Sequence, residues 1–334
     1  MIDPLAADDP PAVVLAAAAC GESLMLRTSA TSGVSRALRR TAASWVDSFP
    51  AVAARLDLRA GDTVWIPGPL AATMNLFAAC LAHWAGASWS AHPQRCRFIQ
   101  TTPTGLRRLV PRTAMSGATV VVAGDRLPAR DRDIARAAGL RVQHYYGAAE
   151  LSLVAWGSCE EDLRLFDDVE ADVRDGQLWV RSPWLSSGPV PGEEPGDWRC
   201  DADGFATVGD LARLAQDRLT VLGRPGSVTT GGATVAVAPI EDALRRGTGD
   251  EVYVVGLAHP HLGEILTAAT MSPDARERSR RWAGRHLDGP HRPRRWLLID
   301  RVPLTAAGKP DRSALVEQLE SEVNGAQRRL GEPV

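Results

Sequence analysis

The sequence predicts an α/β protein, with a large N-terminal α/β domain that includes a small β-rich subdomain and a small α+β C-terminal domain. Short β-branched segments alternate with segments of helical period through the first two thirds of the chain, as in sheets covered by helices. From about residue 157 to 222, glycine, proline and aspartate turns separate strand-like segments. A Pro-Gly-Ser joint at 225–227 then precedes the rest of the chain. The length of 334 residues fits two domains of about 150 residues each.

The N-terminal elements follow in chain order. Ala12–Cys20 is predicted to be an ordinary helix, because acidic residues precede it and the positive region of a signal sequence is missing. After it, apolar β-branched segments predict buried strands, and segments of period 3.6 predict the helices between them. The strands are Thr63–Pro67, Thr119–Ala123 and Leu140–Gln143, and the helices are Leu76–Trp84 and Ala129–Ala138.

The remaining elements belong to the β-rich subdomain and the C-terminal domain. Two strands are predicted in the subdomain, at Leu178–Arg181 and Leu219–Leu222. Beyond the joint, the pattern predicts helices and strands in an α+β arrangement. These are helices Ile240–Arg246 and Arg276–His286 and strands Val252–Gly256 and Trp296–Ile299.

Composition excludes several classes of protein. The net charge is −2 and the isoelectric point about 6.4, so the basic footprint of a nucleic-acid-binding protein is absent. No apolar run reaches the roughly 20 residues that span a bilayer, so no membrane segment is expected. The five cysteines show no CxxC spacing, which favours reduced thiols in a cytoplasmic protein.

A turn at residues 302–312 presents the only lysine of the chain, Lys309, between Gly308 and Pro310. Glycine permits positive φ and proline fixes the chain on the other side. A lysine held in such a turn can be offered to a site elsewhere as a compact charge with three donors. The simpler interpretation is an exposed surface loop.

Three further segments carry polar groups in patterns that suit a nucleotide. Clustered hydroxyls, a glycine and a basic residue can wrap phosphate oxygens, although a Ser/Thr-rich turn before a helix would look alike. A strand ending in aromatic-Gly-x-x-Glu offers a ring for a base and a carboxylate for Mg²⁺. The alternative is that the aromatics pack in the core. An aspartate after a glycine can accept both ribose hydroxyls, or it can be a solvated turn residue. The groups concerned are Thr28, Ser29, Thr31, Ser32, Gly33 and Arg36 in the first segment, Tyr145, Tyr146, Gly147, Ala148 and Glu150 in the second, and Asp210 in the third.

Taken in chain order, these segments resemble the motifs of the adenylate-forming superfamily, which includes acyl-CoA synthetases, the adenylation domains of non-ribosomal synthetases, and luciferases. The resemblance runs from about residue 25 to 315 and is strongest at the lysine turn. The chain is most similar to shortened members, with a size like that of o-succinylbenzoate-CoA synthetases. In the family the C-terminal domain is a mobile lid, so the resemblance implies an adenylation core at 1–223 and a lid carrying the lysine at 224–334.

The resemblance also implies roles for individual residues. Lys309 would contact the carboxylate and the α-phosphate, Glu150 would bind Mg²⁺, and Asp210 would hold the ribose with Arg224 beside it. Around the base, the family pattern implies adenine-pocket contacts by Gly124, His144, Tyr145, Tyr146, Gly147 and Ala148. The phosphate loop corresponds to the hydroxyl-rich segment that ends at Arg36. A pantetheine contact is implied at Gly231 and Gly232, after the hinge.

The activity implied by the resemblance is ATP-dependent conversion of an organic carboxylic acid to an acyl-adenylate, followed by transfer to a thiol. The cofactors would be ATP, Mg²⁺ and coenzyme A or a phosphopantetheine thiol, and the partners a small-molecule carboxylic acid and, for one alternative, an acyl-carrier protein. That alternative is an enzyme that loads a carrier protein or an amine. Departures from the family pattern at Ala30, Ser35, Leu70 and Ala149 leave a third, a non-catalytic nucleotide- or acyl-binding protein.

Overall fold

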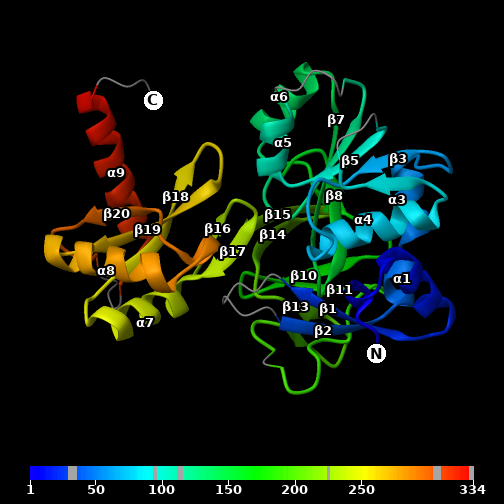
Figure 1. Ribbon diagram of the computed structural model, residues 1–334, viewed down its shortest axis with the longest axis horizontal. Coiled ribbons are helices and arrows are strands. Elements are labelled where there is room, and N and C mark those ends of the chain that lie inside the picture. Colours follow the sequence, from blue (N-terminus) through cyan, green and yellow to red (C-terminus); the bar gives the residue numbers. More distant parts are fainter. Residues whose placement is uncertain are drawn as a thin grey trace. The chain divides into compact units, whose positions relative to one another are not determined.

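The computed structural model describes residues 1–28, 36–92, 96–110, 116–193, 195–223, 226–303 and 310–330. These form two compact units (Figure 1), unit 1 up to residue 223 and unit 2 from residue 226 onward. The mixed α/β fold predicted from the sequence is confirmed. Within the described ranges, no helix combines the length and the apolar character that a membrane crossing needs.

The centre of unit 1 is a run of parallel strands in the order β4-β3-β5-β6-β7, after which the chain returns as the antiparallel β8. All four residues of β6 are buried, as expected of a parallel strand covered on both faces. The strands are β3 (Thr63–Trp65), β4 (Ser88–Ser90), β5 (Phe98–Thr101), β6 (Thr119–Val122), β7 (Arg141–Ala148) and β8 (Ser152–Gly157).

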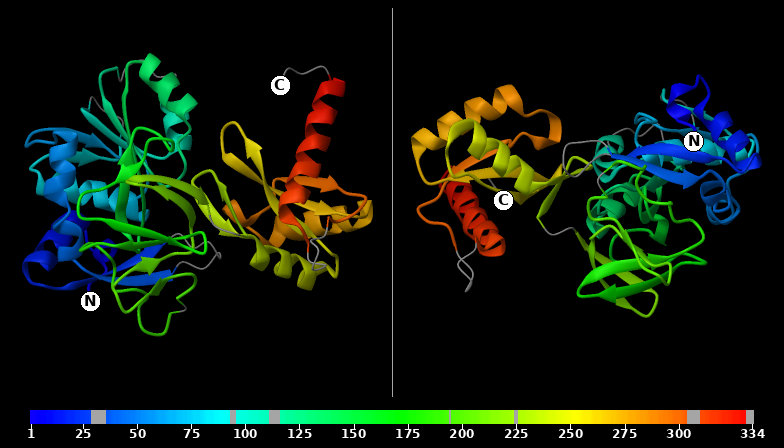
Figure 2. Two further views of the ribbon diagram at one scale, coloured as in Figure 1. Left: turned by 180° about the vertical axis from the view of Figure 1, so that it is seen from behind. Right: turned by 90° about the horizontal axis from the view of Figure 1, so that it is seen from below.

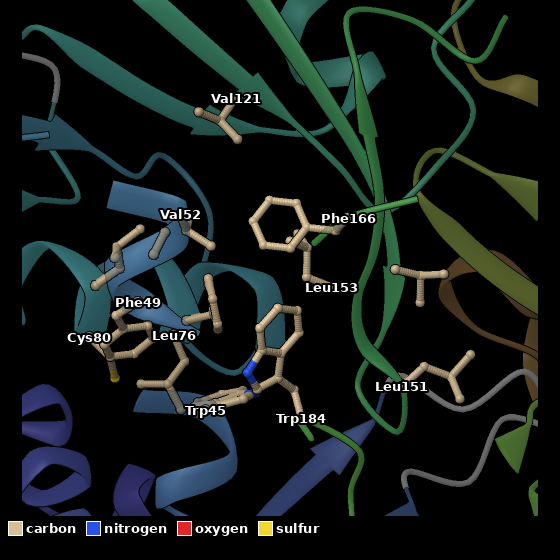
Figure 3. Packing of buried hydrophobic residues seen from close by; sticks show 14 of the residues in the cluster. Trp45, Phe49, Val52, Leu76, Cys80, Val121, Leu151, Leu153, Phe166 and Trp184 are labelled. Atoms are coloured by element: carbon tan, nitrogen blue, oxygen red, sulfur yellow. The ribbon is translucent and has the colours of Figure 1, made fainter. Parts of the chain in front are cut away.

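Helices cover both faces of this parallel sheet (Figure 2). Alternate residues of β6 belong to different core clusters, Val121 to one that includes α3 and α4, and Val120 and Val122 to one that includes α5 and α6. The larger cluster is rich in aromatics (Figure 3), with the rings of Phe49 and Phe77 edge to face at 5.2 Å. The helices are η1 (Pro4–Ala6), α1 (Pro10–Ala19), α2 (Ala43–Val46), α3 (Phe49–Leu56), α4 (Thr73–Trp84), α5 (Pro103–Leu109) and α6 (Ala129–Ala137).

The β-rich region is not a separate sheet. From β8 the hydrogen-bonded path continues through β9, β15, β14, β11, β13 and β12, with β10 beside β11. The predicted subdomain is therefore an antiparallel extension of the central sheet. Its strands are β9 (Arg164–Leu165), β10 (Glu170–Arg174), β11 (Gln177–Arg181), β12 (Arg199–Cys200), β13 (Ala206–Thr207), β14 (Leu211–Ala215) and β15 (Arg218–Gly223).

A separate hairpin pairs β1 (Ser23–Thr28) with β2 (Arg36–Thr41). The free edge of β2 is covered by the segment at 187–190, since Arg39 N donates to the Gly188 carbonyl at 2.8 Å and Ser187 N donates to the Arg39 carbonyl at 2.8 Å. The sequence predicted neither strand. The hairpin ladder ends with Thr28 opposite Arg36, which places Arg36 at the start of β2, where residues 29–35 connect the two strands.

Unit 2 is a layered α/β unit. Its sheet has the order β17-β16-β19-β18, with β20 parallel to β19. Helices α7 and α8 pack on one face and α9 on the other (Figure 2). The elements are β16 (Ser227–Thr230), β17 (Ala233–Ala236), α7 (Val237–Thr248), β18 (Tyr253–His259), β19 (Gly263–Thr270), α8 (Pro273–His286), η3 (Gly289–His291), β20 (Arg295–Leu298) and α9 (Arg312–Leu330).

Candidate active site

Two of the predicted nucleotide-binding segments meet at the end of β7. The Tyr146 hydroxyl donates a hydrogen bond to Asp210 Oδ2 at 2.7 Å, although the residues are 64 positions apart. Asp210 directly precedes β14, and its carbonyl accepts from Leu178 N at 2.8 Å. The backbone of Asp210 is thus fixed by the start of β11, and its carboxylate is aligned with the tyrosine. The geometry brings together one aromatic ring and one carboxylate, as a bound nucleoside would require.

The chain bends sharply just after Tyr146. The register of β7 against β8 shifts between Tyr146 and Gly147, which is a β-bulge. A Cβ at Gly147 would lie 2.2 Å from the Ser152 carbonyl oxygen, so only glycine fits this approach. Ala148 pairs with Ser152, and Glu150 is therefore the middle residue of the connection between the two strands. Tyr146 is therefore near the end of β7, and Glu150 lies two residues beyond that strand.

A buried arginine that sequence reasoning missed lies under this connection. Arg40 of β2 is 0% exposed. Its Nη1 donates to the Ala149 carbonyl at 3.3 Å, and its Nη2 donates to the Trp184 carbonyl. Burial lowers the pKa of Arg40 to about 9, and the charge of Glu150 partly opposes that shift. Period-two alternation in β2 was the available signal, because Arg40 falls on the same inward face as the buried Leu38.

Two predicted base-contact residues are held in the core. The ring of Tyr145 stacks on Trp156 at 5.6 Å and 16°, and burial raises its pKa. His144 is 2% exposed, and its Nδ1 lies 2.9 Å from the Val122 carbonyl oxygen. Desolvation lowers the pKa of His144. The predicted adenine contacts of these two side chains stay predictions, and the geometry favours Tyr146 over Tyr145 as the ring that faces a nucleotide.

Gly124 lies just beyond the carboxyl end of β6, where ligands bind in open α/β sheets. Its φ is +84°, and a Cβ there would meet Met74 Sδ at 3.0 Å. Thr102, just after β5, also lies close to this point. The predicted adenine-pocket glycine thus lies at the carboxyl ends of the parallel strands, as does the end of β7.

Arg36 is linked to the Asp210 region through a short loop. A Cβ built on Gly196 would overlap the Arg36 guanidinium, 1.6 Å from Nη1. A Cβ built on Gly209 would lie 3.0 Å from Cβ of Asp197. Residues 196 and 197 therefore lie between the arginine and the turn before Asp210. This contiguity supports placing the predicted phosphate contact and the predicted ribose contact in one site.

Several predicted site residues lie outside the described residues, namely Ser29, Thr31, Ser32, Gly33, Arg224 and Lys309. Thr28 is described only through its backbone, which pairs with Arg36. In unit 2, Gly231 and Gly232 form the turn between β16 and β17 with φ of +60° and +88°. Gly231 N also donates to the Leu262 carbonyl at 2.9 Å.

The two ends of the lysine segment are fixed in unit 2. Asp311 N donates to the Pro303 carbonyl at 2.9 Å, and Oδ1 of Asp311 caps α9 by accepting from the amides of Ser313 and Ala314 at 3.1 Å each. Arg312 then makes a bidentate pair with Glu241, with Nη1–Oε1 at 2.9 Å and Nη2–Oε2 at 2.7 Å. The hydrogen bonds to Glu241 raise the pKa of Arg312.

Sequence comparison finds relatives among acid–CoA ligases. No family model matches the chain. An uncharacterized acyl-CoA ligase, YhfT of Bacillus subtilis, is 26% identical over 334 residues, covering 89% of this chain and 68% of the relative. A probable 2-succinylbenzoate-CoA ligase of Mycobacterium tuberculosis is 34% identical over 221 residues, covering 61% of this chain. The aligned region spans 55% of that ligase, so the chain matches only about half of its length.

Solved structures share the fold. The o-succinylbenzoate-CoA synthetase of Bacillus subtilis superposes with a TM-score of 0.74 at 20% identity, covering 88% of this chain and 69% of that structure. The amide bond synthetase McbA of Marinactinospora thermotolerans gives 0.71 at 22% identity, with the same coverage of 88% and 69%. At these identities the superpositions show the fold alone. Together with the ligase relatives, the shared fold supports the predicted resemblance to the adenylate-forming superfamily.

Proposed function

We propose that this protein uses ATP to convert an organic carboxylic acid to an acyl-adenylate and then transfers the acyl group to a thiol, that of coenzyme A. The observation that carries the proposal is the bond between the Tyr146 hydroxyl and Asp210 Oδ2. It joins the segments that resemble the adenine and ribose motifs of the family near the end of β7, and Glu150 lies two residues beyond that strand. The kinship with acid–CoA ligases supports the same activity.

The roles of the nucleotide-binding residues follow from their chemistry. The Tyr146 ring would lie against adenine, and the Asp210 carboxylate would accept hydrogen bonds from the ribose hydroxyls. Arg36 and the hydroxyls of residues 28–32 would bind the phosphates, since guanidinium and hydroxyl donors suit phosphate oxygens. Such contacts align the α-phosphorus with the acid, and positioning of this kind can supply a large share of catalysis.

Mg²⁺ fits a single carboxylate at Glu150. The described residues hold no group of three or more His, Cys, Asp and Glu side chains that could form a metal cage. Mg²⁺ in nucleotide sites is held by one or two carboxylates together with phosphate oxygens and water, so a lone glutamate at the turn after β7 is an adequate protein ligand. When bound, the ion would offset the negative charge of the phosphates.

Lys309 is proposed to place its ammonium between the acid carboxylate and the α-phosphate. Charge that develops there is stabilised by a fixed cation. Unit 2 would then turn about residues 224–226, withdrawing Lys309 and bringing Gly231 and Gly232 to the pantetheine arm of the thiol. Hinge motions of this type are absorbed by a few residues at element ends. Free thiols at all five cysteines and the use of ATP support a cytoplasmic location.

The test is exchange of labelled pyrophosphate into ATP over a panel of aryl and acyl acids. We expect Lys309→Ala to lower the exchange rate roughly 10²- to 10³-fold, the cost of one electrostatic contact to the transition state. Arg301→Ala is the matched control, because it removes an exposed cation a few residues upstream. Its exchange rate should stay within about twofold of the wild type, since exposed surface charges contribute little. Full exchange by the Lys309 variant would overturn the role of the lysine.

A second assay identifies the acceptor. Product formed with coenzyme A, with a phosphopantetheine-loaded carrier protein, or with an amine would separate the main proposal from its nearest alternatives. The amine is included because the structural neighbour McbA is an amide bond synthetase. Nucleotide binding without exchange on any acid would instead support a non-catalytic binding protein.

A further inference from the structure

The arginine beneath the Glu150 connection is an unusual group for its place. Arg40 is fully buried and donates to neutral acceptors. Its Nε donates to Ser44 Oγ at 3.1 Å, and its two Nη atoms donate to the carbonyls of Ala149 and Trp184. Its guanidinium carbon lies 5.0 Å from the centre of the Trp45 ring. None of these partners carries a formal negative charge.

Burying such a charge is unfavourable unless the charge is compensated. An apolar side chain at this position would avoid that cost and is often the more stable choice. Glu150 is the residue whose negative charge favours the charged form of Arg40. Arg40 therefore interacts with this connection in two ways. Its charge is attracted by the charge of Glu150, and its guanidinium donates a hydrogen bond to the carbonyl of Ala149, the preceding residue.

The hydrogen bonds of Arg40 also link that connection to a second segment of the chain. It holds the carbonyl of Ala149, immediately before Glu150, and the carbonyl of Trp184 on a separate segment. Ser186, two residues after Trp184, donates its N–H to the carbonyl of Glu150 at 2.8 Å. Leu151 on the other side is 0% exposed and belongs to the same core as Trp45 and Trp184 (Figure 3). The backbone on both sides of Glu150 is fixed, while its carboxylate is part of a half-buried residue.

We propose that Arg40 is a positioning residue for Glu150. Arg40 fixes the backbone of the connection that carries Glu150, and its positive charge interacts with the carboxylate that binds the metal–nucleotide complex. This inference rests on the metal-binding role proposed for Glu150 above. Residues that orient a metal ligand without touching the metal typically contribute roughly 10- to 100-fold in metal affinity or activity. Arg40 would act in this way from within the core.

The experiment measures how much Mg²⁺ strengthens nucleotide binding, as the ratio of the ATP dissociation constant in EDTA to that in excess Mg²⁺, by calorimetry on the full chain. Arg40→Met should lower this ratio roughly tenfold or more, with the KM for the acid unchanged, and Arg40→Lys should restore part of it. Arg39→Met is the matched control, since Arg39 is the exposed neighbour on the same strand, and it should leave the ratio as in the wild type. A folded Arg40→Met protein with the wild-type ratio would overturn the inference.

If Arg40→Met does not fold, a double-mutant cycle between Arg40→Lys and Glu150→Gln decides the question. The inference predicts that Arg40→Lys lowers the ratio only when Glu150 is present, and an equal effect in both backgrounds contradicts it. Failure of the proposed function gives a different result. A wild-type protein with a high ratio but no pyrophosphate exchange on any acid refutes the function and leaves Arg40 to be judged by its ratio. If Mg²⁺ does not change the ATP dissociation constant of the wild type, so that the ratio is one, the inference is refuted. The proposed function is then still tested by pyrophosphate exchange.

Discussion

The ion pair between Glu241 and Arg312 ties the start of α9 to the opposite face of unit 2, and removing its charge tests how the lysine segment is held. Glu241 of α7 accepts at Oε1 from Val254 N at 2.6 Å and from Arg312 Nη1 at 2.9 Å, and at Oε2 from Arg312 Nη2 at 2.7 Å. Both oxygens therefore face donors. In Glu241→Gln the new amide nitrogen must face one of those donors, so one bond becomes a repulsive contact and the charge is lost.

The magnitude follows from the exposure of the two side chains, 9% for Glu241 and 38% for Arg312. Removing one partner of a fully buried pair costs about 3–5 kcal/mol because the other charge is left uncompensated. Arg312 can regain water on its exposed side and keeps its bond to the Val254 carbonyl at 2.9 Å, which reduces the cost to about 2–3 kcal/mol. At about 1.4 kcal/mol per tenfold, local opening becomes roughly 30- to 150-fold more frequent.

The assay is native-state hydrogen exchange on the full chain, read on peptides that cover α7, β18 and the start of α9. Glu241→Gln should speed exchange there by the factor given above and leave the peptides of unit 1 unchanged. Glu251→Gln is the matched control, because its pair with Arg245 is 3.6 Å long and about half exposed on both sides, and such pairs contribute about 0–1 kcal/mol. Equal effects of the two variants would refute the reasoning from burial.

Two further predictions concern the end of β7. Tyr146→Phe removes the hydrogen bond to Asp210, the predicted ribose ligand, and should raise the KM for ATP by roughly tenfold, the scale of a bond to a charged group. Tyr145→Phe should change this KM little. Steady-state kinetics that rank the two variants the other way would contradict the assignment. The pKa of His144 is lowered from 6.5 by burial, so below pH 6.5 the unfolded state binds more protons and the free energy of unfolding should fall as the pH drops. Urea unfolding between pH 5 and 8 should show this fall in the wild type and a flatter profile in His144→Asn, and identical profiles would rule the histidine out as its source.

The sequence predicts elements well where one local signal is strong. The TVVV run at residues 119–122 is β6, and the predicted helices at Leu76–Trp84 and Ala129–Ala138 correspond to α4 and α6 with small shifts of their ends. The aromatic-Gly-x-x-Glu pattern located the turn that carries Glu150, because a strand end and a close backbone approach both leave local marks. The prediction of Lys309 as the catalytic charge stays a prediction, since residue 309 is outside the described residues.

What the sequence could not give is long-range pairing and the choice of face. The β-rich region is hydrogen-bonded to the central sheet through β9 and β15, and no local pattern encodes that neighbour. Of the adjacent Tyr145 and Tyr146, one stacks in the core on Trp156 and the other bonds Asp210, a distinction set by the facing strand. Arg40 was overlooked because arginine is almost never fully buried, so composition argued against the inward position that alternation indicated.

The closed base of the lysine segment limits how far Lys309 can travel by itself. Asp311 is bound to Pro303 and caps α9, and Arg312 is clamped to Glu241. Residue 309 is two positions from Asp311, and two residues of fully extended chain span at most about 7 Å. Whatever conformation the segment takes, the lysine α-carbon stays within that tether of the first turn of α9. Any longer displacement of the ammonium, beyond the length of its own side chain, must come from movement of unit 2 as a whole.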